Sequence, residues 1–281
     1  MTRQDALITV AELREAQAGE NPPVILDVRW TLGAPAEAGR AAYDGGHIPG
    51  AIYVDLDVDL ADHTNDDPRR GRHPLPTTAQ IQASARRWGL HSSSAIVLVD
   101  DNASQGAARG WWVLRWAGFT TVRVLDGALA AWREEGLPLE SSEPAVAPSD
   151  ITLTTGHMPI LTADDAGQIA REGLLLDARP EDRFRGENET RDPRAGHIPG
   201  AVNAPTAGNL DGQRFASDDA LRTRYEGLGV RGGTVGVSCG SGVTACHDLL
   251  ALSVIGVSAA LYPGSWSAWA NDPDRPVQLG V

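Results

Sequence analysis

Residues 46–51 read Gly-His-Ile-Pro-Gly-Ala, and residues 196–201 read the same six amino acids. A second pair of segments has the same separation, because LDVRW around Asp27 recurs as LDARP around Asp177. A third pair, LDGALAAW and YPGSWSAW, lies near the end of each half. Three matched blocks in the same order indicate a duplicated domain.

Outside these blocks, each half alternates short apolar runs with helical patterns. VILDV, AIVLVD and TVRVLDG in the first half correspond to LLLDA, TVGVSC and AALYPG in the second. Short β-branched runs of this kind are typical of buried parallel strands, with helices as the crossovers. The sequence therefore predicts an α/β fold of two tandem domains, each with a mainly parallel sheet flanked by helices.

The segment between the halves sets the expected domain boundaries. Residues 139–159 are rich in Pro, Ser and Thr and show no amphipathic period, which predicts a surface linker. We expect one domain at residues 1–138 and the other at residues 160–281. Thr9 with Glu12, and Thr162 with Asp165, have capping-box spacing and predict the start of a helix in each half.

Charge and composition limit the partners. The 281 residues carry 24 basic and 37 acidic side chains, a formal net charge of −13, which disfavours nucleic acid and anionic membranes as partners. Every basic side chain is an arginine, so no lysine can form a Schiff base. The N-terminus lacks the apolar core of a signal peptide, and the longest apolar stretch, residues 249–261, is too short to span a bilayer. We expect a cytoplasmic protein, in which thiols stay reduced.

The segment TVGVSCGSGVTACHDLLAL, residues 234–252, carries the predicted chemistry. A strand ends at Ser238, Cys239 follows, and two glycines let the loop curl before a helix begins near Val243. Backbone N–H groups and the positive end of the helix can then face the sulfur and favour its thiolate. Cys246 lies within the helix and is interpreted as a core residue.

Other interpretations of this loop lead to different proteins. A cysteine phosphatase needs an arginine six residues after the nucleophile, but Ala245 stands there. A buried structural cysteine beside a turn would carry no chemistry at all. The two cysteines suggest no metal site, and no nucleotide-binding glycine motif follows a strand, so we expect no cofactor.

The HIPGA blocks, the CGSGVTA loop and the YPGSW segment together resemble the tandem rhodanese family of sulfurtransferases over essentially the whole chain. Mercaptopyruvate sulfurtransferases of this family carry C-G-[ST]-G-V-T-A, whereas thiosulfate sulfurtransferases carry C-R-K-G-V-T-A. Residues 239–245 match the first form. The first half looks degenerate, because Asp101 aligns with Cys239. The chain departs from the family at Ala268, where a glutamate is usual.

The resemblance implies roles for several residues. Arg185 and Arg191 would bind the carboxylate and keto group of mercaptopyruvate, with Arg194 as an alternative to Arg191. Ser241, His73 and Asp57 would form a proton relay. The persulfide on Cys239 would rest on the backbone of the loop residues Gly240, Ser241, Gly242, Val243 and Thr244. His47 and His197 occur in both copies, so they are interpreted as structural.

The resulting hypothesis is a sulfurtransferase that moves a sulfane sulfur through a Cys239 persulfide. The donor would be 3-mercaptopyruvate, and the acceptor would be cyanide or a thiol, such as a thioredoxin-like protein. Two alternatives stay open: a thiosulfate:cyanide sulfurtransferase, and a non-catalytic sulfur carrier or binding module that keeps only the fold.

Overall fold

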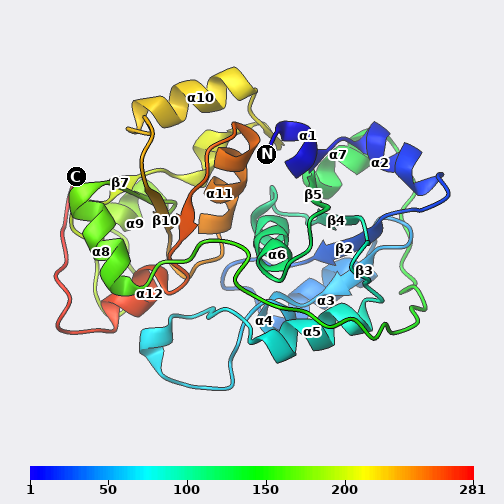
Figure 1. Ribbon diagram of the computed structural model, residues 1–281, viewed down its shortest axis with the longest axis horizontal. Helices are drawn as coiled ribbons and strands as arrows, with labels where there is room; N and C mark the ends of the chain where they lie inside the picture. Colours follow the sequence, from blue (N-terminus) through cyan, green and yellow to red (C-terminus); the bar gives the residue numbers. More distant parts are fainter.

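A computed structural model describes residues 1–281, apart from the side chain of Ala36. The chain forms two α/β lobes, each with a parallel sheet flanked by helices (Figure 1). This arrangement confirms the predicted fold class and the duplication. No helix in the described chain combines the length and the apolar character needed to cross a lipid bilayer.

The sheet of the first lobe has five parallel strands. In spatial order they are β1 (Leu7–Ile8), β5 (Val122–Leu125), β4 (Ile96–Val99), β2 (Val24–Val28) and β3 (Ile52–Val54). The central strand β4, IVLV, is buried along its whole length, as expected for a strand covered on both faces. The helices of this lobe are α1 (Arg3–Ala6), α2 (Val10–Gln17), α3 (Ala36–Asp44), α4 (Leu56–Asp59), η1 (Pro68–Arg70), α5 (Thr78–Arg87), α6 (Gln105–Trp116) and α7 (Ala128–Glu134).

The second lobe repeats this plan with a four-stranded parallel sheet. Its strands, in spatial order, are β11 (Ala260–Leu261), β10 (Val235–Ser238), β6 (Leu174–Asp177) and β7 (Val202–Asn203). A separate antiparallel pair consists of β8 (Leu210–Asp211) and β9 (Arg214–Phe215). The helices are α8 (Ala163–Glu172), α9 (Glu181–Arg185), η2 (Thr206–Asn209), α10 (Asp218–Gly227), α11 (Ala245–Val254) and α12 (Ser265–Ala270).

Local signals in the sequence explain where several of these elements begin. The Thr9 side chain accepts a hydrogen bond from the Glu12 N–H, while the Glu12 carboxylate accepts one from the Thr9 N–H, so α2 starts with a capping box. Thr162 and Asp165 form the same box at the start of α8. Both predicted helix starts are confirmed.

The repeated GHIPGA turn has a structural role in each lobe. The backbone of His47 pairs with Glu140, and the backbone of His197 pairs with Gln278, so each turn is clamped by the segment that leaves its lobe. A side chain at Gly196 would lie 2.3 Å from the Gln278 carbonyl oxygen, which explains why this position is a glycine. The turn belongs to the fold of both copies.

One hydrophobic core runs through both lobes. A single cluster of buried side chains extends from the first sheet through α6 and α11 to the second sheet. These two helices pack against each other in the middle of the molecule (Figure 1). The linker crosses the first lobe and is held by hydrogen bonds from Ser149 to Arg86 and from His157 to Trp116. Because the lobes share one core, residues from both can form a fixed site between them.

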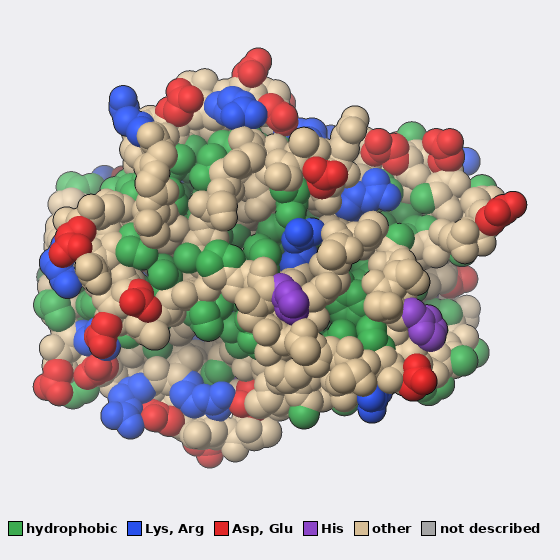
Figure 2. All heavy atoms as spheres, viewed as in Figure 1, with side chains coloured by type: hydrophobic (Ala, Val, Ile, Leu, Met, Phe, Trp, Pro, Cys, Tyr) green, Lys and Arg blue, Asp and Glu red, His purple; other side chains and the backbone are tan. Residues whose placement is uncertain are grey.

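The surface shows both signs of charge. On the face drawn in Figure 2, acidic side chains are interspersed with arginines. The excess of acidic groups in the sequence is therefore spread over this face rather than gathered in one patch.

Candidate active site

The loop that joins β10 to α11 holds Cys239 in a defined position. Gly242 has a φ of +80°, and a Cβ there would lie 2.3 Å from the Pro263 carbonyl oxygen, so only glycine fits. Its N–H donates to the Cys239 Sγ at 3.1 Å. The Ser265 hydroxyl lies 3.9 Å from the same sulfur and accepts a hydrogen bond from the Cys239 N–H. The Ser265 hydroxyl donates its proton to the Tyr262 carbonyl oxygen at 2.9 Å, so the Gly242 N–H supplies the close donor to the sulfur.

The rest of the loop leaves further N–H groups available. Among the residues that the structure describes, those of Gly240, Ser241, Val243 and Thr244 donate to no protein acceptor. These four residues line a cavity of about 130 Å³, while the Cys239 side chain beside them is only 1% exposed. Free amides gathered in one loop at a strand-to-helix junction can hold an anion, here an outer sulfur atom carried by Cys239.

A hydrogen-bond chain connects this loop to the first lobe. The His73 Nδ1 lies 2.8 Å from the Ser241 Oγ, and the His73 Nε2 lies 3.1 Å from the Asp57 Oδ1. The structure thus brings together the three residues that the resemblance implied. The ring of His73 is nearly buried and packs edge-on against Trp30. We call Ser241, His73 and Asp57 the relay.

The surroundings of the relay set its protonation. Burial lowers the pKa of His73 below its ordinary value, although Asp57 partly offsets this effect. The hydrogen bond from His73 lowers the pKa of Asp57. At neutral pH the ring is therefore neutral and Asp57 is a carboxylate. Since Asp57 can only accept, the ring proton sits on Nε2, and Nδ1 accepts the proton of the Ser241 hydroxyl.

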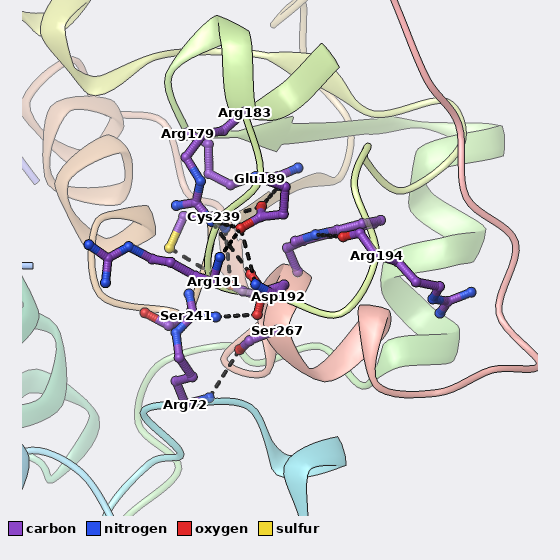
Figure 3. Close-up of polar contacts among 12 residues, drawn as sticks. Arg72, Arg179, Arg183, Glu189, Arg191, Asp192, Arg194, Cys239, Ser241 and Ser267 are labelled. Atoms are coloured by element: carbon purple, nitrogen blue, oxygen red, sulfur yellow. Dashed lines mark hydrogen bonds and ion pairs between the residues drawn. The ribbon is translucent and has the colours of Figure 1, made fainter. Parts of the chain in front are cut away.

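Three arginines line the same cavity as the loop (Figure 3). Arg179 is buried and held by Asp177 through three hydrogen bonds of 2.7 to 3.1 Å. Arg183 donates to Glu189, and Arg72 reaches from the first lobe to pair with Asp192. Sequence reasoning missed Arg72, Arg179 and Arg183, although Arg179 could have been noticed because Asp27 and Arg29 repeat its pairing in the first half.

The structure places the predicted substrate arginine Arg185 away from this cavity. It pairs with Glu181 and Glu187 and does not line the cavity. Arg183 does line the cavity. Arg183 and Arg185 are two positions apart in the helix α9, so their side chains are about 200° apart around the helix axis and point to opposite sides. The sequence Arg-Phe-Arg does not show which of the two arginines faces the substrate, because this depends on the orientation of α9.

Arg191 and Arg194, the two candidates for the second substrate arginine, have different surroundings. Arg191 lies in a neighbouring cavity of about 250 Å³, which shares Trp30, Leu32 and Arg72 with the first. Its guanidinium packs against Gly33 of the first lobe, where a Cβ would lie 2.5 Å from its Nη2. Arg194 instead donates to backbone carbonyls around α12. Arg194 therefore has a structural role, and Arg191 faces the cleft between the lobes.

His47, His197 and Cys246 lie in surroundings that agree with a structural role. The Nδ1 atoms of His47 and His197 lie within hydrogen-bond distance of the Tyr43 and Phe184 carbonyl oxygens, in agreement with their structural interpretation. Burial raises the pKa of Cys246 to about 12, so it remains a thiol.

Asp100, and not Asp101 as the sequence comparison predicted, occupies the place in the first lobe that corresponds to Cys239, because Val99 pairs with Asp27 as Ser238 pairs with Asp177. The Asp100 carbonyl oxygen accepts from the Leu129 N–H, as that of Cys239 accepts from the Trp266 N–H. Asp101 is the next residue along the loop. Its carboxylate pairs with Arg29, which also binds Asp27. A carboxylate cannot carry a sulfane sulfur, so the first lobe supplies the relay and one wall of the cleft. Among the described residues, no group of three His, Cys, Asp or Glu side chains is arranged to hold a metal ion.

Comparisons with known proteins agree with this architecture. The family model for the rhodanese-like domain matches residues 9–135 and 162–272. The Mycobacterium tuberculosis protein SseB, named as a candidate thiosulfate sulfurtransferase, is 46% identical over 99% of both chains. A candidate 3-mercaptopyruvate sulfurtransferase of Pseudomonas aeruginosa is 43% identical over 98% of this chain and 99% of its own. The crystal structure of the Escherichia coli 3-mercaptopyruvate sulfurtransferase SseA superposes with a TM-score of 0.82 at 31% identity, covering 95% of this chain and 99% of that one.

These matches cover both lobes. The chain belongs to the rhodanese family, as a sulfurtransferase with two rhodanese-like domains.

Proposed function

We propose that the protein transfers sulfur from 3-mercaptopyruvate to a thiol or to cyanide through a persulfide on Cys239. The observation that carries this choice of donor is the relay, which ends on Ser241 in the loop of Cys239. Members of the family use 3-mercaptopyruvate or thiosulfate as the sulfur donor. The two donors differ in whether the leaving group must gain a proton.

The chemistry of each donor explains the preference. When a thiolate attacks the sulfur of mercaptopyruvate, an S–S bond forms and the C–S bond breaks, and the electron pair passes to carbon as an enolate. This enolate must gain a proton to become pyruvate, and the thiol proton of the donor balances it. Thiosulfate releases sulfite, which leaves with its electron pair and needs no proton. A relay that polarises the substrate carbonyl or moves a proton therefore serves mercaptopyruvate.

The arginines provide a receptor for the carboxylate end of this donor. Arg183 lines the wall of the cavity beside Gly240, and Arg191 lines the adjoining space. A planar guanidinium can bind a carboxylate with two parallel hydrogen bonds. In this arrangement the substrate carboxylate lies on Arg183 and Arg191, and its sulfur faces Cys239. The loop amides then hold the persulfide after pyruvate leaves.

The second half of the reaction returns the enzyme to its thiolate. An acceptor nucleophile attacks the outer sulfur, the S–S bond of the persulfide breaks, and Cys239 leaves with the electron pair. We propose a reduced thiol as the physiological acceptor, such as a thioredoxin-like protein in the cytoplasm. Cyanide serves as the acceptor in an assay.

The relay can be tested with a matched pair of histidine variants. His73→Asn should lower kcat/KM for mercaptopyruvate about 10²- to 10³-fold, the usual range for loss of acid–base assistance, and should change kcat/KM for thiosulfate less than about 3-fold. His63→Asn is the control, because this exposed histidine lies 3.7 Å from the same Asp57 but is outside the hydrogen-bond chain. Equal losses with both donors in His73→Asn would contradict the proposed donor.

A further inference from the structure

Arg72 fills a space that the cysteine loop leaves open. A Cβ built on Gly240 would lie 3.2 Å from the Arg72 Nη2 and 3.3 Å from the Arg183 Nη1. The loop itself, Gly240-Ser241-Gly242, is neutral. Because residue 240 has no side chain, two guanidinium groups from other segments approach the loop instead. One of them comes from the first lobe, far away in the sequence.

The backbone around Arg72 holds the side chain in this place. The Arg72 N–H donates to the Ser267 Oγ at 3.0 Å, so the segment is attached to α12 of the second lobe (Figure 3). Gly71, with a φ of +86°, sits so close that a Cβ would lie 2.7 Å from the Gly264 carbonyl oxygen. Asp192 binds the Arg72 Nη1 from the other side. The guanidinium is therefore positioned before any substrate arrives.

The guanidinium groups around the cavity have unused hydrogen-bond donors. Within the described chain, the Arg72 Nη2, the Arg179 Nη1 and the Arg183 Nε are buried and make no hydrogen bond. The Arg179 side chain is 1% exposed, and its Nη1 has only a distant ion pair, at 3.8 Å, with Glu189. All three arginines line the same cavity as Gly240 and Ser241. Buried donors without acceptors indicate a site prepared for an anion.

We propose that Arg72 is a specificity-determining residue that binds a second anionic group, attached directly to the sulfur that is transferred. The inference rests on the proposed Cys239 persulfide. It concerns thiosulfate, the dianionic donor named for a relative of this chain, at the same site. Mercaptopyruvate has one negative charge, on a carboxylate remote from its sulfur, so Arg183 and Arg191 suffice for it. A dianion whose charge lies next to the sulfur needs a cation beside Gly240, where Arg72 lies.

The step with thiosulfate balances without any further reactant. The Cys239 thiolate attacks the outer sulfur, a new S–S bond forms, and the S–S bond of thiosulfate breaks. Sulfite leaves as a dianion with the electron pair, and the persulfide keeps the single charge of the thiolate. Arg72 stabilises the negative charge that gathers on the leaving sulfite, and its effect should be larger for this donor than for mercaptopyruvate.

The test compares both donors in four proteins: the wild type, Arg72→Met, Arg72→Lys and Arg69→Met. Arg72→Met should lower kcat/KM for thiosulfate about 10- to 100-fold, the loss expected for a hydrogen bond to a charged group, and kcat/KM for mercaptopyruvate less than about 5-fold. It should also raise the inhibition constant of sulfite about 10-fold or more. Arg72→Lys should recover part of the thiosulfate activity. Arg69→Met is the matched control, because this exposed arginine of η1 pairs with Asp67 and does not line the cavity.

A variant with the opposite expected effect on the donor ratio tests whether Arg72→Met acts only by disturbing the structure. Asp192→Asn removes the charge that pairs with Arg72, but it leaves this arginine in place with one more free donor. Arg183 loses only its longer contact with Asp192, at 3.4 Å, and keeps Glu189 at 2.9 Å. Its ratio of thiosulfate to mercaptopyruvate activity should rise, whereas in Arg72→Met it should fall. The ratio does not depend on how much of each variant folds.

The outcomes separate this inference from the proposed function. A wild type that does not use thiosulfate, or an Arg72→Met variant with an unchanged donor ratio, would overturn the role of Arg72. A wild type that uses thiosulfate but does not cleave mercaptopyruvate would instead overturn the proposed donor, while a fall in thiosulfate activity in Arg72→Met would still support the role of Arg72.

Discussion

Replacing Arg109 by methionine should loosen the contact between the cysteine loop and the first lobe. Arg109 lies on α6 and is fully buried. It donates to the Gly242 carbonyl oxygen at 3.0 Å, to the Leu60 carbonyl oxygen at 2.9 Å and to the His73 carbonyl oxygen at 3.1 Å. No carboxylate in the described chain pairs with it. One guanidinium thus connects the cysteine loop with the segment that carries the relay.

The expected loss follows from these contacts. A hydrogen bond to a charged group contributes about 1.5 to 3 kcal/mol, and Arg109→Met leaves three buried carbonyl groups without their donor. The variant also avoids the cost of burying the guanidinium, which is several kcal/mol. The same burial lowers the pKa of Arg109 in the native protein. We expect the free energy of unfolding to fall by about 3 kcal/mol. This corresponds to a decrease in Tm of about 6 to 12 °C for a chain of this size.

Urea unfolding followed by tryptophan fluorescence measures this loss. The matched control is Arg115→Met on the same helix, since Arg115 is only half-buried and donates to a single carbonyl, that of Thr120. Its loss should stay below about 1 kcal/mol. Arg109→Lys should recover part of the stability, because one ammonium group cannot reach all three carbonyls. An Arg109→Met variant that unfolds within about 1 kcal/mol of the wild type would refute the role given to Arg109.

Three further predictions concern single residues. Arg183→Met should raise KM for mercaptopyruvate at least about 10-fold, whereas Arg185→Met should leave it within about 2-fold, because only Arg183 lines the cavity; steady-state kinetics with equal effects would contradict the assignment. Cys246→Ala should retain turnover within about 2-fold, since burial keeps this residue a thiol, and a large loss would show that it takes part. Burial raises the pKa of Asp248 to about 7, so the native state keeps a proton that the unfolded chain releases, and the free energy of unfolding should fall as pH rises from about 4 to about 7. In Asp248→Asn, the free energy of unfolding from urea titrations should fall by roughly 2 to 4 kcal/mol less over this pH range. The same dependence on pH in the variant and the wild type would contradict the raised pKa.

Much of the fold could be predicted because its signals are local or repeated. The GHIPGA blocks, the apolar strand runs and the capping boxes each depend on residues close together in the sequence. The Cys239 loop could be recognised for the same reason, as a strand, two glycines and a helix in direct succession. The relay residues could be named only through the family resemblance, because His73 and Ser241 are 168 positions apart.

The missed residues show the limit of sequence reasoning. Arg72 and Arg109 act across the interface between the lobes, and no local pattern indicates which arginines will cross it. The choice between Arg183 and Arg185 has another difficulty, since the sequence does not show which side of the short helix α9 faces the cavity. In both cases the deciding information is the relative placement of elements, which depends on tertiary packing.

Intact-mass spectrometry can show whether Cys239 carries the transferred sulfur. After mercaptopyruvate is added without an acceptor, the wild type and Cys246→Ser should each gain the mass of one sulfur atom. Cyanide should then remove it as one equivalent of thiocyanate. Cys239→Ser should gain nothing and should not turn over. A Cys239→Ser variant that still acquires and transfers sulfur, or a wild type that never gains it, would show that Cys239 is not the sulfur carrier.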